Sequence, residues 1–293
     1  MKRNVTVVVP TYNRAHLIGK TVPTYLQSNK VYEVIIVNDC STDNTIEVVE
    51  DLIKQFPQIR LINLTKNSKQ TVAKNIGMDQ VTTEFIFFGD DDSFVMPGAI
   101  DELFESMVKY EADIASARAL YLKSEWDLEN LSQVLIREDK IHEELVNFSR
   151  MELNFHVQTN KVVEVPVCHA YFIIRTSDAK RIRFDENFIG NCFREETDFT
   201  IRAHSMGLKI IYNPYVPQFN YPRSLASGGA SGMPKFKYVI YSLKNNWYFL
   251  KKNRMLIEEL LGERVSLSFL QFELFVKLIK QSIRVTIRNI FKK

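Results

Sequence analysis

Short apolar segments alternate with helical patterns through the first 90 residues of this chain. The apolar segments lie at residues 5–9, 31–37, 60–64 and 84–89, and the helical patterns between them lie at residues 15–27, 42–55 and 70–80. A strand, a helix and a second strand in succession favour a right-handed crossover between parallel strands. The alternation therefore predicts an α/β fold, a doubly wound and mainly parallel sheet with helices on both faces.

The pattern after residue 90 is less regular. We expect a helix over residues 97–110, a strand over residues 113–117 and a helix over residues 195–206 that Gly207 ends. Residues 120–160 are rich in Glu, Asn and Lys, and we interpret them as an insertion over the site, where acceptor contacts would lie. Strand-like patterns are also expected at residues 162–174 and 209–212.

Charge and cysteine content exclude several classes of protein. The formal net charge of +3 is too small to indicate nucleic-acid binding. Cys40, Cys168 and Cys192 show no CxxC spacing and cannot all pair with one another, which favours a reducing compartment and argues against a structural zinc site. No apolar run reaches the roughly 18 residues of a transmembrane helix. We therefore predict a cytoplasmic protein that binds no nucleic acid.

Polar residues follow three of the predicted strands at their carboxyl ends, in residues 10–14, 38–43 and 89–93. Ligands of open α/β sheets bind in the crevice beyond these ends, so we expect the three loops to converge. Asp39 could accept a hydrogen bond from a nucleobase or a ribose hydroxyl, and the ring of Tyr12 could stack on a base. Both residue types are also common in turns.

Three consecutive aspartates, Asp90, Asp91 and Asp92, follow the fourth predicted strand. Adjacent like charges repel unless a cation neutralises them, and carboxylate oxygens suit Mg²⁺ or Mn²⁺, which bind phosphate oxygens as well. A solvated turn or a helix cap is the alternative. The sequence contains neither GxGxxG after the first strand nor GxxxxGK[ST], so a metal would have to bind the phosphates of a nucleoside diphosphate.

A second acidic cluster begins the helix expected at residues 195–206. Glu195 and Asp198 are three residues apart on this helix, with Glu196 on a different side. A carboxylate that points into the crevice could act as the general base of a transfer reaction. Alternatively, these acids only stabilise the amino end of the helix, and Arg194 and Arg202 are their ion-pair partners.

Together these segments resemble the family 2 glycosyltransferases of GT-A fold over about residues 4–214. The matching segments, in the order of the family, are VVVPTYNR, IIVNDCSTDNT, VAKNIGMD, FFGDDDSFVMPGAI and FDENFIGNCFREETDF, followed by MGLKIIYNP. Each segment alone is a weak signal, whereas five in the correct order are strong.

The resemblance implies roles for individual residues. In the family, the first loop and the acid that ends the second strand hold the nucleoside. Those positions are Pro10, Thr11, Tyr12, Arg14 and Asp39. Asp90 and Asp92 match the DXD motif, with Asp92 the implied metal ligand and Asp91 the middle residue. Lys74 takes a position where the family often has arginine, which implies a contact with phosphate or ribose.

The general base of the family lies in a Glu-Asp pair. Matching on FREETDF puts Glu195 and Glu196 at that pair, with Asp198 two positions further on. The second member of the pair is glutamate here. The resemblance therefore implies Glu196 as the base, and Asp198 is the alternative.

The implied activity is transfer of a sugar, with inversion, from a nucleoside-diphosphate sugar to an acceptor hydroxyl on a lipid-linked saccharide, a polysaccharide or a glycan. The implied cofactor is Mn²⁺ or Mg²⁺. Two alternatives stay open: a nucleotidyltransferase acting on sugar phosphates, and a catalytically silent nucleotide-sugar-binding module at a membrane. We expect a catalytic domain over residues 1–215, with its donor half at about 1–118 and its acceptor half at about 119–215. Residues 216–293 would form a flexible loop and C-terminal helices.

The expected C-terminal helix, residues 267–293, is amphipathic. Its apolar arc contains Phe272, Phe275, Val276, Ile279, Ile283, Ile287 and Ile290, and its basic side contains Lys277, Lys280, Arg284 and Arg288. Such a helix could lie on the cytoplasmic face of an anionic membrane, pack on the catalytic domain, or join a second copy in a homodimer. Residues 221–232, rich in Gly and Ser, either close over the donor diphosphate or form a linker.

Overall fold

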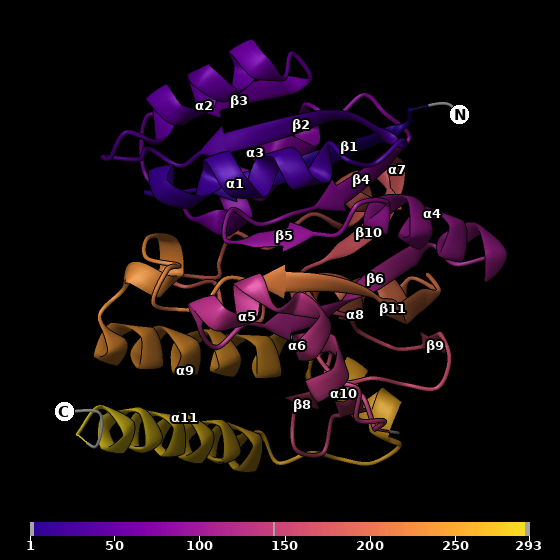
Figure 1. Cartoon of the computed structure of the whole chain (residues 1–293). Helices are drawn as coiled ribbons and strands as arrows, with labels where there is room; N and C mark the ends of the chain where they lie inside the picture. Colours follow the sequence, from indigo (N-terminus) through magenta and orange to yellow (C-terminus); the bar gives the residue numbers. More distant parts are fainter. Residues whose placement is uncertain (1–2, 143, 291–293) are drawn as a thin grey trace.

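The computed structural model describes residues 3–142 and 144–290, with side chains described up to residue 280 and at Ile283. Within this range the centre of the protein is a nine-stranded sheet (Figure 1). The strands lie in the order β3-β2-β1-β4-β10-β6-β11-β5, and β9 pairs with β11. Their bounds are β1 (Val5–Thr11), β2 (Val31–Asn38), β3 (Ile59–Asn63), β4 (Phe85–Phe88), β5 (Ser93–Val95), β6 (Ile114–Tyr121), β9 (Val163–Glu164), β10 (Phe172–Arg175) and β11 (Ile210–Asn220).

The predicted mainly parallel sheet is confirmed. β1 pairs in parallel with β2 and β4, β2 with β3, and β6 with β11. β10 lies antiparallel between β4 and β6, and β5 and β9 are antiparallel to β11. The segment before β10 contains the short elements α5 (Glu125–Glu129), α6 (Leu131–Arg137), β7 (Val146–Asn147) and β8 (Glu152–Leu153).

Helices cover both faces of the sheet, as predicted (Figure 1). One face packs against α1 (Ala15–Tyr25), α2 (Thr45–Gln55) and α4 (Ala99–Lys109), and the other against α3 (Gln70–Asp79), α7 (Thr176–Ile182) and α8 (Glu195–Ser205). Val7 and Val9 of β1 join the first core and Val8 joins the second, because neighbouring side chains on a strand point to opposite faces. Two apolar cores explain why this strand is apolar at every one of these positions.

β11 is much longer than the strand expected at residues 209–212. It continues to Asn220, and its second half pairs with β5, a three-residue strand that the sequence pattern did not indicate. Pro214 and Pro217 lie where the pairing of β11 with β6 shifts register. Proline within a strand signals a break in sequence patterns, although it is tolerated at such irregularities. The expected domain boundary at residue 215 falls inside this strand, and the division into two parts stays a prediction.

Three C-terminal helices continue the layer that contains α8 (Figure 1). They are α9 (Lys235–Lys252), α10 (Arg254–Leu261) and α11 (Leu267–Ile290). Phe249, Leu250, Ile257 and Leu270 from these helices belong to the same hydrophobic core as α3 and α8. α11 lies against α9 and forms the outer edge of the molecule in this view (Figure 1).

The described part of α11 has two apolar faces. Leu270, Leu274 and Leu278 are buried. The predicted apolar arc contains the exposed side chains Phe272, Phe275, Ile279 and Ile283, at 58%, 44%, 40% and 52% exposure. The leucines therefore form the face that packs on the protein, and these four residues of the apolar arc are exposed. The side chains of Arg284, Ile287, Arg288 and Ile290 lie outside the described residues. No described helix combines the length and the apolar character needed to cross a membrane.

Candidate active site

The three loops that follow β1, β2 and β4 converge on one cavity of about 250 Å³, as predicted. Its lining includes Pro10, Thr11, Tyr12, Arg14, Asp39, Asp90, Asp91 and Asp92. Gly229, Ala230, Ser231 and Met233 from the segment after β11 also line it. Eight of the residues named from the sequence are thus brought together at the carboxyl edge of the sheet, where ligands of such folds bind.

Arg14 forms ion pairs with two of the three consecutive aspartates. Its Nη2 lies 2.8 Å from Asp92 Oδ2, and its Nε lies 3.3 Å from Asp91 Oδ1. The hydroxyl of Thr11 donates a hydrogen bond to Asp91 Oδ2 at 2.7 Å. Arg14 is buried, so its charge acts on the two carboxylates with little screening by water.

Of the residues that the structure describes, Arg14 is the one ion-pair partner of the three aspartates in this loop. Burial raises the pKa of Asp90 to about 7, reinforced by Asp92 and Glu196 and opposed by Lys74. Burial likewise raises the pKa of Asp91 to about 6, although Arg14 opposes the shift. Carboxyl groups with such pKa values would release their protons more readily if a cation came close. Among the described residues, no group of three or more Asp, Glu, His or Cys side chains is assembled around a single point.

Tyr25, at the end of α1, fixes the backbone of this loop. Its hydroxyl donates to the carbonyl oxygen of Asp90 at 2.8 Å and accepts from the Asp90 N–H at 3.1 Å. A Cβ on Gly89 would lie 2.9 Å from the Tyr25 ring, so glycine is needed for this close approach. The sequence gives no sign of this role of Tyr25, because the role depends on a contact with a residue 65 positions away along the chain.

Asp39 lines the cavity, but its carboxylate is already hydrogen-bonded. The backbone N–H groups of Ser68 and Lys69 donate to its Oδ1 and Oδ2, at 2.5 and 2.9 Å. Burial raises its pKa despite these bonds. Asp39 therefore shapes the loop before α3, and its contact with a nucleoside stays a prediction.

Lys74 joins the two glutamates at the start of α8. Its Nζ lies 3.0 Å from Glu195 Oε1 and 2.8 Å from Glu196 Oε1. The side chains of Lys74 and Glu195 are 1% exposed, whereas that of Glu196 is 21% exposed. Burial raises the pKa of Glu195 well above its usual range. Burial acts in the same direction on Glu196, but the charge and hydrogen bond of Lys74, together with His169 and Glu195, outweigh it and the pKa of Glu196 is lowered. Glu196 is therefore ionised at neutral pH.

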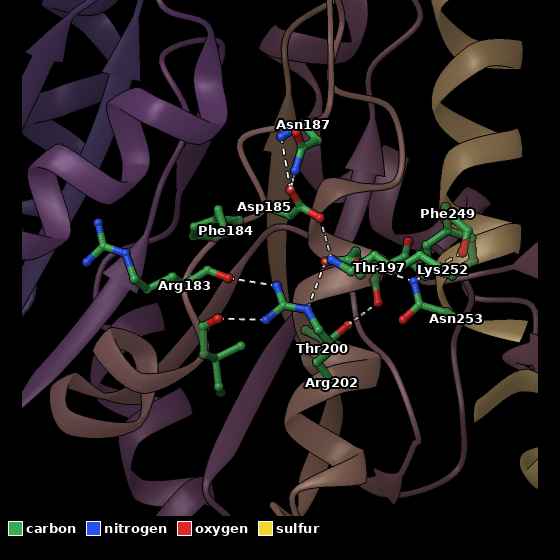
Figure 2. Close-up of polar contacts among 12 residues, drawn as sticks. Arg183, Phe184, Asp185, Asn187, Thr197, Thr200, Arg202, Phe249, Lys252 and Asn253 are labelled. Carbon is green, nitrogen blue, oxygen red and sulfur yellow. Dashed lines mark hydrogen bonds and ion pairs between the residues drawn. The ribbon is translucent and has the colours of Figure 1, made fainter. Parts of the chain in front are cut away.

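Asp198 is fully buried in a different network. Arg202 Nε, Lys252 Nζ and Asn253 Nδ2 lie 2.9, 2.9 and 2.8 Å from its oxygens. Figure 2 shows Lys252 and Asn253 of the C-terminal region reaching this part of α8, where Lys252 also contacts Asp185. These contacts occupy both carboxylate oxygens, so Asp198 links α8 to the end of α9.

A second cavity, of about 730 Å³, lies between α8 and α11. Glu195 and Glu196 line it, but Asp198 and Lys74 do not. Residues 150–153 and Phe155 also line it, and the acceptor contacts expected in residues 120–160 stay a prediction. Gln70 and Asn191 line both cavities, so the two adjoin.

The segment after β11 lies against the first loop. Arg14 Nη1 donates to the carbonyl oxygen of Ser227 at 3.0 Å, and the Gly229 N–H donates to that of Tyr12 at 2.9 Å. Gly228 has a φ of +99°, and a Cβ there would lie 2.0 Å from the Asn13 carbonyl oxygen. The glycine- and serine-rich segment therefore covers part of the cavity.

The sheet, the acidic loop at its edge and the second acidic centre define an α/β protein of GT-A type. A model of glycosyl transferase family 2 matches residues 6–183, and the chain belongs to this family.

Curated relatives each match somewhat more than a third of the chain. Glycosyltransferase GlyA of Streptococcus pneumoniae serotype 4 is 30% identical over 112 residues, 38% of this chain and 16% of the relative. GalNAc(5)-diNAcBac-PP-undecaprenol beta-1,3-glucosyltransferase of Campylobacter jejuni is 38% identical over 104 residues, 34% of this chain and 33% of the relative. Poly(ribitol-phosphate) beta-N-acetylglucosaminyltransferase TarP of Staphylococcus aureus is 29% identical over 116 residues, 38% of this chain and 35% of the relative.

Solved structures share the fold over most of the chain. Residues 1–349 of S. aureus TarS, in complex with UDP-GlcNAc, align with a TM-score of 0.60 and 17% identity, over 89% of this chain and 72% of that one. The mannosyltransferase PcManGT from Pyrobaculum calidifontis, in complex with GDP-Man and Mn²⁺, aligns with a TM-score of 0.58 and 17% identity. The alignment covers 95% of this chain and 70% of that one.

Proposed function

We propose that this protein is an inverting, metal-dependent glycosyltransferase that moves a sugar from a nucleoside-diphosphate sugar to an acceptor hydroxyl. The observation that carries the proposal is the adjacency of two cavities. The first contains the acidic loop Asp90–Asp92, and the second contains an ionised carboxylate, Glu196. A donor in the first and an acceptor in the second would meet where Gln70 and Asn191 line both.

The first cavity fits a divalent cation. It offers carboxylate oxygens, the ligand type that Mg²⁺ and Mn²⁺ prefer, and burial raises the pKa of two of the three aspartates. Asp92 and Asp90 would hold the cation, and Asp92 would then share it with Arg14, which lies 2.8 Å away. Asp91 already accepts a hydrogen bond from Thr11 and pairs with Arg14. A bound cation would supply positive charge that stabilises the departing diphosphate. The structure of PcManGT in complex with Mn²⁺ and a nucleotide sugar supports this proposal.

Glu196 is proposed as the general base. As the acceptor oxygen attacks the anomeric carbon, Glu196 takes the proton of that hydroxyl. The bond from the anomeric carbon to the diphosphate oxygen breaks on the opposite side, and its electron pair leaves with the nucleoside diphosphate. Lys74 keeps Glu196 ionised beforehand and orients it through the 2.8 Å contact.

The acceptor is proposed to be a saccharide on a lipid or a polymer. The names of two relatives point to such acceptors, an undecaprenol-linked saccharide for one and poly(ribitol-phosphate) for the other. The exposed arc Phe272, Phe275, Ile279 and Ile283 on α11 is proposed to contact a membrane surface, with Lys277 and Lys280 beside it.

Replacing Asp92 with alanine tests the proposal. Metal-dependent release of nucleoside diphosphate from the donor should fall by at least about 100-fold, because electrostatic stabilisation of the leaving group is lost. Circular dichroism should show an unchanged fold, and EDTA should have the same effect on the wild type. Transfer that persists in EDTA would refute the role of the metal. Release of pyrophosphate from a nucleoside triphosphate supplied with a sugar phosphate would instead identify a nucleotidyltransferase.

A further inference from the structure

The second cavity is lined by an unusual set of cations. Five basic side chains contribute to its wall, from the β7–β8 hairpin, α8, the segment after β11 and α11. They are Arg150, Arg194, Arg223, Lys277 and Lys280. Elements that are far apart in the sequence therefore bring positive charge to one space beside Glu196.

None of these five cations forms an ion pair within the part of the chain that the structure describes. The same cavity is also lined by four glutamates, but Glu195 and Glu196 already share Lys74. Glu152 and Glu273 are the other two. The cations thus outnumber the carboxylates that remain, and the space can receive a negative charge.

Arg194 is the most constrained of the five. Its Nε donates to Asn246 Oδ1 at 3.2 Å and its Nη2 to the carbonyl oxygen of Met151 at 3.0 Å, so both partners are neutral. Burial alone lowers its pKa to about 10. Its backbone has a φ of +76°, a left-handed conformation that is unfavourable for a non-glycine residue. Arg194 is half-buried and has only these neutral hydrogen-bond partners, so an anionic ligand would supply the charged partner that it lacks.

We propose that this cavity selects an acceptor that carries a phosphate group next to the reacting hydroxyl, with Arg194 as its specificity-determining contact. The guanidinium fork matches the geometry of phosphate oxygens, and Arg194 lies two residues before the proposed base Glu196. Arg150 and Lys277, exposed at the wall of the cavity, add a field that attracts such an anion. The inference rests on the proposed function, because it names the class of the acceptor for that reaction.

Phosphorus NMR titration of the full chain tests the proposal, with glycerol 3-phosphate and geranyl phosphate as probes. EDTA is present, so that no metal holds a probe at the aspartates. The wild type should bind glycerol 3-phosphate, and Arg194→Gln should weaken this binding by about tenfold, the loss of one charge-assisted hydrogen bond. Tighter binding of geranyl phosphate would assign the phosphate to a lipid-linked acceptor, and equal binding would assign it to a soluble or polymeric one.

Two further variants keep the test decisive if Arg194→Gln fails to fold. Arg150→Gln, at an exposed position in the same cavity, should weaken binding severalfold, whereas Arg175→Gln, an exposed arginine on β10 outside the cavity, should not change it. Equal affinity of the wild type, Arg194→Gln and Arg150→Gln would overturn the proposal. Metal-dependent binding of nucleoside diphosphate is measured on the same proteins. Its absence, with phosphate binding intact, would contradict the proposed function and leave the anion site standing.

Discussion

Glu196 and Asp198 lie two residues apart on one helix, yet different contacts hold them. Glu196 is partly exposed to the second cavity, whereas Asp198 is enclosed by Arg202, Lys252 and Asn253. A base must reach the proton that it removes, and an acid with both oxygens occupied by cations and an amide donor is poorly placed to do so. The difference supports the proposed role of Glu196 as the base and favours a structural role for Asp198.

Replacing each acid should therefore produce a different defect. Glu196→Gln should lower kcat by about 100-fold or more, because general base catalysis is lost. It should destabilise the fold less than Asp198→Ala does, because glutamine still offers an acceptor to Lys74 and Glu195 remains as an ion-pair partner. Asp198→Ala should lower the free energy of unfolding by about 1–3 kcal/mol, because the buried Asn253 and the partly exposed Arg202 and Lys252 lose their shared acceptor. Steady-state rates and urea titrations measure the two effects. A folded Asp198→Ala protein that has lost turnover, together with an active Glu196→Gln protein, would move the base to Asp198.

The pH dependence of activity should report the influence of Lys74 on Glu196. The base works when ionised, and its lowered pKa means that the acidic limb of kcat/KM lies below the usual glutamate value of 4.5. Lys74→Met removes the charge that favours ionisation, so burial should then raise the pKa and move this limb to higher pH. Lys74→Arg should restore the original limb, since it keeps the charge. A limb that is identical in wild type and Lys74→Met would contradict this electrostatic role.

At the scale of secondary structure elements, the sequence predicted those with a strong period. β1, β2, α1 and α3 lie within a few residues of their expected ranges because each strand is buried on both faces and each helix has a clear apolar side. β5 has three residues, too few for a period to appear, and the prolines in β11 suggested a break. The contacts of the site were less predictable. Convergence of the loops follows from topology, but the contact of Lys74 with Glu195 joins residues 121 positions apart.

The segment after β11 offers a prediction at this scale. Gly228→Ala places a Cβ against the carbonyl oxygen of Asn13 and strains a backbone with a φ of +99°. The segment should then leave the first loop, which would weaken binding of the nucleotide donor by about tenfold or more through the lost cavity wall. Gly232→Ala is the matched control, because a Cβ there meets nothing within 4 Å. Fluorescence titration with a nucleoside diphosphate compares the two variants, and equal affinities would mean that the segment is only a linker.

At the scale of the whole molecule, α11 has two apolar faces with different surroundings. Leu270 and Leu274 are buried and line the second cavity, whereas Phe272 and Ile283 are exposed. Lys277 and Lys280 also line this cavity, so the helix that carries the exposed arc also forms part of the proposed acceptor site. Contact of the arc with a bilayer would bring that site close to lipid-linked acceptors.

Vesicle binding tests the proposed orientation. The wild type should sediment with vesicles that contain phosphatidylglycerol, because the apolar arc inserts among the acyl chains and the lysines meet anionic headgroups. Phe272→Ser combined with Phe275→Ser should weaken partitioning by about tenfold or more, since two aromatic side chains no longer leave water. Val108→Ser, which replaces an exposed apolar side chain on α4, is the matched control and should bind like the wild type. If the double variant still sediments with vesicles, the arc does not contact lipid. If wild-type vesicle binding is absent and the double variant loses a dimer seen by analytical ultracentrifugation, the arc instead packs against a second copy of the chain.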